Sequence, residues 1–173
     1  MKGFKVGPGN EPGVVIGPLI DEQGLKKVEA HVADATSKGA KVILGGEKHE
    51  KGGFFFQPTV ITGVTPQMLV SHEETFGPVA PLIRFKTEDE AIRLSNATEF
   101  GLAGYFYSRD IGRIWRVAEQ METGMVGVNA GIISTEVAPF GGVKQSGLGR
   151  EGSRHGLEEF MEVKYVLMGG TDK

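Results

Sequence analysis

The chain has 173 residues, 39% of them hydrophobic and 24% charged, with a formal net charge of −3. These values suit one soluble globular domain with its own core, and so small a charge predicts neither a nucleic-acid nor a membrane partner. The sequence has no cysteine, which excludes disulfides, thiolate metal sites and a cysteine nucleophile within these residues. It shows neither a signal peptide nor an apolar stretch long enough to span a membrane, so we expect a cytoplasmic protein.

The first half of the sequence predicts one long helix followed by short strands. Residues 21–38 carry apolar side chains at helical spacing, and Asp21 is suited to cap that helix. Strands are expected at residues 41–44, 59–62 and 79–85.

Helices and strands continue to alternate in the second half. Thr87 and Glu90 form a capping box that opens a helix, and a further helix is expected between Asp110 and Gly124. A short helix is expected at residues 155–161, and strands are expected at residues 103–107, 125–128 and 163–168. This alternation predicts an α/β fold with a largely parallel sheet and flanking helices. We expect the last strand to pair either within the domain or with another subunit.

Several motifs favour structural roles. Residues 147–152 match G-x-G-x-x-G, but they follow a loop rather than a strand and too few residues follow for a βαβ unit, so we interpret them as a structural loop. The histidines show no metal-ligand spacing, and we expect no metal site. They are His31, His49, His72 and His155. No serine lies in a nucleophile-elbow sequence.

Residues 72–78 are more informative and read His-Glu-Glu-Thr-Phe-Gly-Pro. One interpretation is a solvated acidic turn with Phe76 packed as an anchor. The other is a ligand site, because a carboxylate can accept hydrogen bonds from two vicinal hydroxyls and an aromatic side chain can pack against a flat ring.

This segment resembles the Glu-Glu-x-Phe-Gly-Pro motif of the aldehyde dehydrogenase family. Asn129, which follows the strand expected at residues 125–128, also matches that family, as does the signature at residues 139–151. The resemblance covers essentially the whole chain. Within the family, three segments are most similar to succinate-semialdehyde dehydrogenases, namely residues 101–108, 114–120 and 131–135.

The resemblance implies both a fold and a reaction. Residues 1–160 would form a partial catalytic domain, and residues 161–173 a strand of the oligomerisation region of a homo-oligomer. In the family, a cysteine thiolate attacks the aldehyde, hydride passes to NAD or NADP, and a glutamate-activated water releases the acid. The cysteine and the nucleotide-binding half lie upstream in relatives. The chain would therefore be about the last third of such an enzyme and inactive alone.

Four residues carry over from the family by position. Glu74 matches the residue that holds the hydroxyls of the nicotinamide ribose, and Phe76 matches the aromatic beside the nicotinamide. Phe140 matches an aromatic of the aldehyde tunnel, and Ser134 matches a serine that helps to hold the far carboxylate of the substrate. From the residues alone, Ser134 is equally well a loop serine that bonds its own backbone.

Three alternatives to a succinate-semialdehyde dehydrogenase fragment stay open. The chain could be a free-standing, non-catalytic domain that binds a partner subunit through its last strand. It could be a defunct gene product without function. It could also belong to an aldehyde dehydrogenase of another substrate preference.

Overall fold

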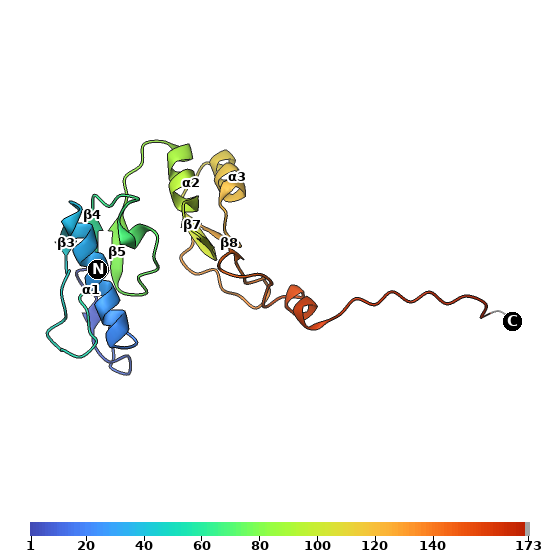
Figure 1. Cartoon of the computed structure of the whole chain (residues 1–173), viewed down its shortest axis with the longest axis horizontal. Coiled ribbons are helices and arrows are strands. Elements are labelled where there is room, and N and C mark those ends of the chain that lie inside the picture. The colour runs from blue at the N-terminus through green and yellow to red at the C-terminus, as the bar shows by residue number, and fades with distance from the viewer. Residues whose placement is uncertain (172–173) are drawn as a thin grey trace. The chain divides into compact units, whose positions relative to one another are not determined.

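The computed structural model describes residues 1–171, which fall into two compact units. The first unit is Met1–Leu94, and the second unit begins at Ser95. Helices and strands alternate in both units, which confirms the α/β fold (Figure 1). The division expected at residue 160, between a catalytic part and an oligomerisation part, stays a prediction.

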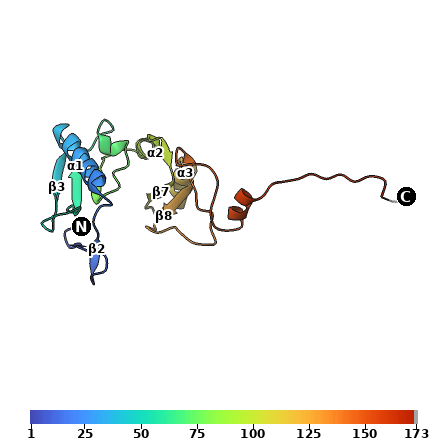
Figure 2. The same ribbon diagram turned by 60° about the horizontal axis from the view of Figure 1, so that its bottom comes forward.

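The first unit is built on a three-stranded sheet covered by helix α1 (Glu22–Ser37) (Figures 1 and 2). The strands lie in the order β3 (Lys41–Leu44), β4 (Thr59–Thr62), β5 (Val79–Leu82). Strand β4 pairs antiparallel with β3 and parallel with β5. The expected helix and strands are thus confirmed, although β5 ends three residues earlier than its apolar run suggested.

The core of the first unit lies between α1 and this sheet. Helix α1 begins at Asp21, whose carboxylate accepts a 2.8 Å hydrogen bond from the backbone N–H of Gly24. Its apolar face is fully buried, and the same cluster includes side chains from β4 and from the following loops. The members with the lowest exposure are Val28, Ala35, Phe56, Ile61 and Met68. Burial of this cluster, at about 25 cal/mol per Å² of apolar surface, is what holds α1 on the sheet.

Four further elements belong to the first unit or to its boundary with the second unit. Strands β1 (Lys5–Val6) and β2 (Val14–Ile16) form a separate parallel pair. The 3₁₀ helix η1 (Leu69–Ser71) leads toward β5. Helix α2 (Glu88–Asn96) spans the border between the units. Its expected start is confirmed, because the backbone N–H of Glu90 donates to the hydroxyl of Thr87.

The second unit has two small sheets and little buried apolar surface. Strand β7 (Ala103–Phe106) pairs parallel with β8 (Met125–Val128), and helix α3 (Ile111–Gln120) connects them. Strand β6 (Phe100–Gly101) pairs antiparallel with β9 (Val143–Lys144). Within the described residues of this unit, no large hydrophobic side chain is buried.

The strand expected at residues 163–168 does not form within this chain. The short helix before it is the 3₁₀ helix η2 (His155–Phe160), and the described residues that follow lie in no strand. The side chains of Val163, Tyr165 and Leu167 are exposed. A strand needs a neighbour for its backbone N–H and C=O groups, and the described part of this chain provides none. The alternative of pairing within the domain is therefore wrong, and pairing with another subunit stays a prediction.

The close packing of Gly77 on α1 gives a stability prediction. A Cβ atom at Gly77 would lie 2.5 Å from Cγ2 of Val28 and 3.3 Å from Cδ2 of Leu19. Val28 is fully buried, and its branched side chain has little freedom to move away. We expect Gly77→Ala to lower the free energy of unfolding by about 1–3 kcal/mol.

Urea titration of the chain measures this difference, and Gly17→Ala is the matched control. A Cβ atom at Gly17 meets nothing within 4 Å, so this variant should stay within about 0.5 kcal/mol of the wild type. Equal stability of the two variants would contradict the packing of Gly77 on α1.

Candidate functional site

The first candidate site lies on the loop of residues 72–78, between η1 and β5. Glu74 is exposed, and no hydrogen bond or ion pair holds its carboxylate within the described part of the chain. Phe76 is 81% exposed, so the packed-anchor interpretation of this side chain is wrong. The loop therefore presents to solvent a carboxylate without a polar partner in the described range and an uncovered aromatic ring.

The backbone of this loop is strained at Phe76. Its φ angle is +48°, a value that bulky L-residues seldom adopt. Such a conformation persists only where the surrounding structure holds it, and it is concentrated at ligand sites. Residues 74–76 lie in no helix or strand, so contacts from outside the loop must supply this restraint.

Helix α1 supplies polar contacts to this loop and to the segment before it. His31 is 1% exposed and contacts the side chains of Glu73 and Thr75. One turn further on, the carboxylate of Asp34 accepts a 2.8 Å hydrogen bond from the backbone N–H of Leu69. The ammonium of Lys38 bonds the same carboxylate at 2.6 Å, and together these bonds hold the pKa of Asp34 below its ordinary value.

His31 was not identified as part of a site from the sequence, where the spacing of the histidines predicted only the absence of a metal site. The available signal was the position of His31 on the apolar face of the long helix, three residues after Val28 and one before Val32. A histidine at a core position needs polar partners, but the sequence does not identify distant partners.

Two candidate residues of the second unit follow strand β8. Asn129 comes directly after the strand, and Ser134 lies in the loop beyond it. The amide of Asn129 accepts from the backbone N–H of Ser108 at 2.9 Å and donates to its carbonyl at 2.7 Å. These two hydrogen bonds to the backbone of Ser108 tie the end of β8 to the segment that follows β7. Ser134 follows in the next loop, where it is exposed, and no hydrogen bond engages its hydroxyl among the described residues.

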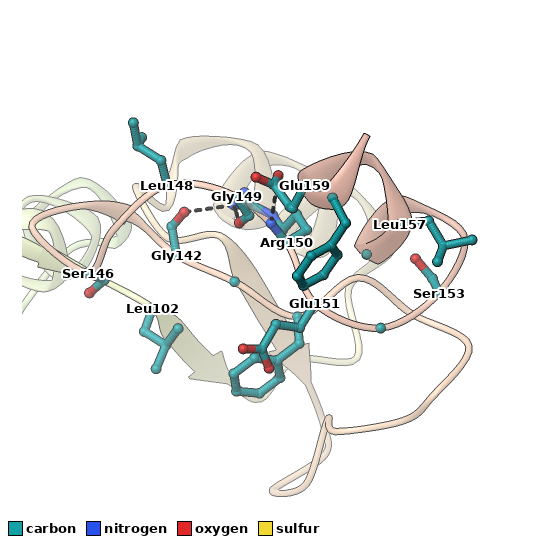
Figure 3. A pocket seen from close by; sticks show the side chains of 15 residues that line it. Leu102, Gly142, Ser146, Leu148, Gly149, Arg150, Glu151, Ser153, Leu157 and Glu159 are labelled. Carbon is teal, nitrogen blue, oxygen red and sulfur yellow. Dashed lines mark hydrogen bonds between the residues drawn. The ribbon is translucent and has the colours of Figure 1, made fainter. Parts of the chain in front are cut away.

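Phe140 is half-buried at the start of the glycine-rich loop. Its backbone N–H donates to the carbonyl of Glu151 at 2.8 Å, and the reverse bond is 2.7 Å long. Between these residues, the guanidinium of Arg150 donates to the carbonyls of Gly142 and Gly149, at 2.8 Å and 2.7 Å. Figure 3 shows Arg150 against this loop, at a cavity of about 670 Å³.

The segment 147–152 is a structural loop, as expected. Gly147, Gly149 and Gly152 all have positive φ angles, which explains the choice of glycine there. The loop closes on itself through Arg150 and leads only to the short helix η2. Only the two-residue antiparallel strand β9 precedes it, so it lacks the parallel strand and the long helix of a dinucleotide-binding unit.

The predicted site residues thus fall into two pairs. Glu74 and Phe76 share one loop of the first unit, while Ser134 and Phe140 belong to the second unit. Among residues 1–171, no group of three or more His, Cys, Asp or Glu side chains could hold a metal ion. In the same range, no helix is long and apolar enough to cross a membrane.

Comparison with known proteins gives close relatives. 3-Sulfolactaldehyde dehydrogenase of Pseudomonas putida is 63% identical over 171 residues, 99% of this chain and 35% of that protein. Glutarate-semialdehyde dehydrogenase of Pseudomonas aeruginosa is 61% identical over 167 residues, 96% of this chain and 35% of that protein. Human mitochondrial succinate-semialdehyde dehydrogenase is 60% identical over 169 residues, 98% of this chain and 32% of that protein.

Solved structures give the same result. Succinate-semialdehyde dehydrogenase from Burkholderia pseudomallei matches with a TM-score of 0.90 and 63% identity, covering 92% of this chain and 33% of that one. An NADP-dependent enzyme of E. coli matches with a TM-score of 0.93 and 58% identity, covering 95% of this chain and 34% of that one. Betaine aldehyde dehydrogenase of Staphylococcus aureus in complex with NAD⁺ matches with a TM-score of 0.86 and 41% identity, covering 92% of this chain and 32% of that one.

The chain spans about a third of the length of these relatives. The family model described as "Aldehyde dehydrogenase family" matches residues 1–166, nearly the whole chain. With relatives above 60% identity and matching structures across both units, the chain belongs to the aldehyde dehydrogenase family.

Proposed function

We propose that this chain is a carboxy-terminal part of an NAD(P)-dependent aldehyde dehydrogenase that oxidises succinate semialdehyde to succinate. The observation that carries the proposal is the loop of residues 72–78, where Glu74 and Phe76 are exposed and Glu74 has no hydrogen-bond or ion-pair partner among residues 1–171. Solved relatives include an NADP-dependent enzyme and an NAD⁺ complex, so either coenzyme is consistent with the family.

The exposed groups of this loop fit a nicotinamide coenzyme. The carboxylate of Glu74 has two free acceptor oxygens, enough for the two hydroxyls of a ribose. The uncovered ring of Phe76 offers an apolar face to a flat heterocycle. A bound coenzyme would supply the hydride acceptor, and the part of these two residues is to hold its ribose and ring in place.

The substrate assignment rests on the second unit. The three relatives named above act, by their names, on aldehydes that carry an acidic group at the far end. The exposed hydroxyl of Ser134 can donate to such a group, and Phe140 would line the apolar path of the aldehyde. A hydroxyl alone does not distinguish a carboxylate from a sulfonate. The choice of succinate semialdehyde as the substrate therefore rests on the resemblance of residues 131–135, around Ser134, to succinate-semialdehyde dehydrogenases.

We also propose that the parent enzyme is a homo-oligomer built in part by the tail after η2. The apolar side chains of this tail are exposed, and no strand in the described part of the chain pairs with it. A second subunit that adds its sheet edge would satisfy the backbone of the tail and cover these side chains. In this proposal the contact assembles a catalytic homo-oligomer, in contrast to a non-catalytic domain that only binds a partner subunit.

We expect the isolated chain to have no aldehyde-oxidising activity. It contains no cysteine, and a thioester-forming enzyme needs a thiolate nucleophile. Formation of NADH or NADPH from succinate semialdehyde should stay at the level of a boiled sample.

The matching positive experiment uses a chimera in which this chain replaces the corresponding third of human succinate-semialdehyde dehydrogenase. We call this chimera the completed enzyme. This protein keeps the cysteine and the nucleotide-binding half of the human enzyme and should oxidise succinate semialdehyde. Turnover by the isolated chain above the boiled sample would show that the chemistry does not need the cysteine.

A further inference from the structure

The buried side chain of His31 lies beneath the loop that presents Glu74. Its Nδ1 atom is 2.9 Å from the hydroxyl oxygen of Thr75, and its Nε2 atom is 3.2 Å from a carboxylate oxygen of Glu73. These two residues flank Glu74 in the sequence. The imidazole therefore holds the loop on both sides of the exposed carboxylate, and it forms no hydrogen bond with Glu74 itself.

For a neutral imidazole, the hydrogen-bonding capacities of the three side chains assign one arrangement. An ionised carboxylate only accepts, so Nε2 of His31 must carry the proton that it donates to Glu73. In a neutral ring, Nδ1 is then an acceptor and receives the hydroxyl proton of Thr75. Both ring nitrogens are satisfied, as a ring that is 1% exposed requires.

The same helix holds the end of the loop through an apolar contact. Gly77 packs so closely on Val28 that a Cβ atom would lie 2.5 Å from its Cγ2. Val28 and His31 are one helical turn apart, so one face of α1 carries both contacts. The strained backbone of Phe76 lies between the two points of attachment, at Thr75 and at Gly77.

We propose that His31 is a positioning residue of the cofactor site. By bonding Glu73 and Thr75 it sets the place at which the carboxylate of Glu74 meets the nicotinamide ribose. The inference rests on the proposed function, in which Glu74 receives the ribose hydroxyls. A histidine that only stabilised the packing of α1 would leave the loop and the coenzyme geometry unchanged when its bond to Thr75 is removed.

The first test uses the full 173-residue chain and needs no activity. Nitrogen-15 shifts of the His31 ring should show a protonated Nε2 and an unprotonated, hydrogen-bonded Nδ1. In Thr75→Val, which keeps the side-chain shape and removes the hydroxyl, the backbone order parameters of residues 74–76 should fall from about 0.85 toward 0.6. His72→Ala is the control, because His72 is exposed on the same loop and should leave these values unchanged.

The second test measures hydride transfer in a single turnover of the completed enzyme. Thr75→Val should slow hydride transfer by about tenfold or more, since misplacement by an ångström costs up to a hundredfold. The KM for succinate semialdehyde should change less than twofold. His31→Ala should slow transfer further, and His31→Gln should restore part of the loss.

The outcomes separate the two claims. A completed wild-type enzyme that transfers no hydride overturns the proposed function and the inference with it. Normal transfer in the wild type, with the same rate and the same loop order in Thr75→Val as in His72→Ala, overturns the inference alone. A loop loosened by Thr75→Val without a slower hydride step also overturns it, because His31 would then anchor the loop without positioning the coenzyme.

Discussion

Glu74→Gln should slow hydride transfer in the completed enzyme by about a hundredfold, the cost expected when a reacting ring is misplaced by about an ångström. The amide keeps one acceptor oxygen but replaces the other with a donor, so it cannot accept one ribose hydroxyl on each of two oxygens as the carboxylate does. The KM for the aldehyde should change much less, because Glu74 makes no contact with the substrate in this account. Single-turnover absorbance of the reduced nicotinamide measures the hydride step directly.

Glu50→Gln is the matched control for this experiment. Glu50 is also an exposed glutamate of the first unit, and it lies outside the loop of residues 72–78. This variant should retain the wild-type hydride rate. If Glu74→Gln behaves in the same way, Glu74 is a solvated turn residue and the loop is no coenzyme site.

Ser134→Ala should lower kcat/KM for succinate semialdehyde by roughly ten- to a hundredfold. A hydroxyl that donates to a carboxylate contributes about 1.5–3 kcal/mol, and each 1.36 kcal/mol is a factor of about ten. The exposed position of Ser134 means that its loss removes no packing within the chain. Steady-state kinetics of the completed enzyme, with and without this substitution, measure the change in kcat/KM.

Butanal is the control substrate for Ser134→Ala. It has the same length as succinate semialdehyde but no carboxylate, so it makes no bond with Ser134 and should lose less than twofold. An equal loss on both substrates would mean that Ser134 supports its loop rather than recognising the acid. The choice of succinate semialdehyde over other aldehydes would then lose its local support.

Local features of the fold were predictable from the sequence because neighbouring residues determine them. Asp21 caps α1 as expected and Asp110 caps α3 at the expected start of that helix, since capping needs only the residue itself and the N–H group three residues on. At α2 the expected box forms with one difference. The carboxylate of Glu90 accepts from the backbone N–H of Lys86 rather than from that of Thr87.

Features that depend on distant residues were not predictable from the sequence. The partners of His31 lie 42 and 44 residues further along the chain, and no periodicity connects them. The strand expected at residues 163–168 has a suitable sequence but no neighbour within the described residues. A β-strand forms only as part of a ladder, so its apolar pattern is a necessary and not a sufficient condition.

The candidate site shows the same limit. The motif of residues 72–78 identified Glu74 and Phe76, but not which side chains would be exposed. One of the two interpretations of the sequence packed Phe76 as an anchor, and the structure shows an exposed ring on strained backbone. An exposed aromatic held at positive φ is unfavourable for an isolated domain, and it fits a surface that a coenzyme covers.

Turnover of succinate semialdehyde by the completed enzyme tests the central claim most directly. With NAD or NADP present, the account predicts equal amounts of succinate and reduced nicotinamide, with a higher kcat/KM for succinate semialdehyde than for butanal. The Glu74→Gln variant of the same protein should form both products far more slowly. A completed enzyme that folds like its human parent but forms no succinate, or that does so equally fast with Gln at residue 74, would contradict the account.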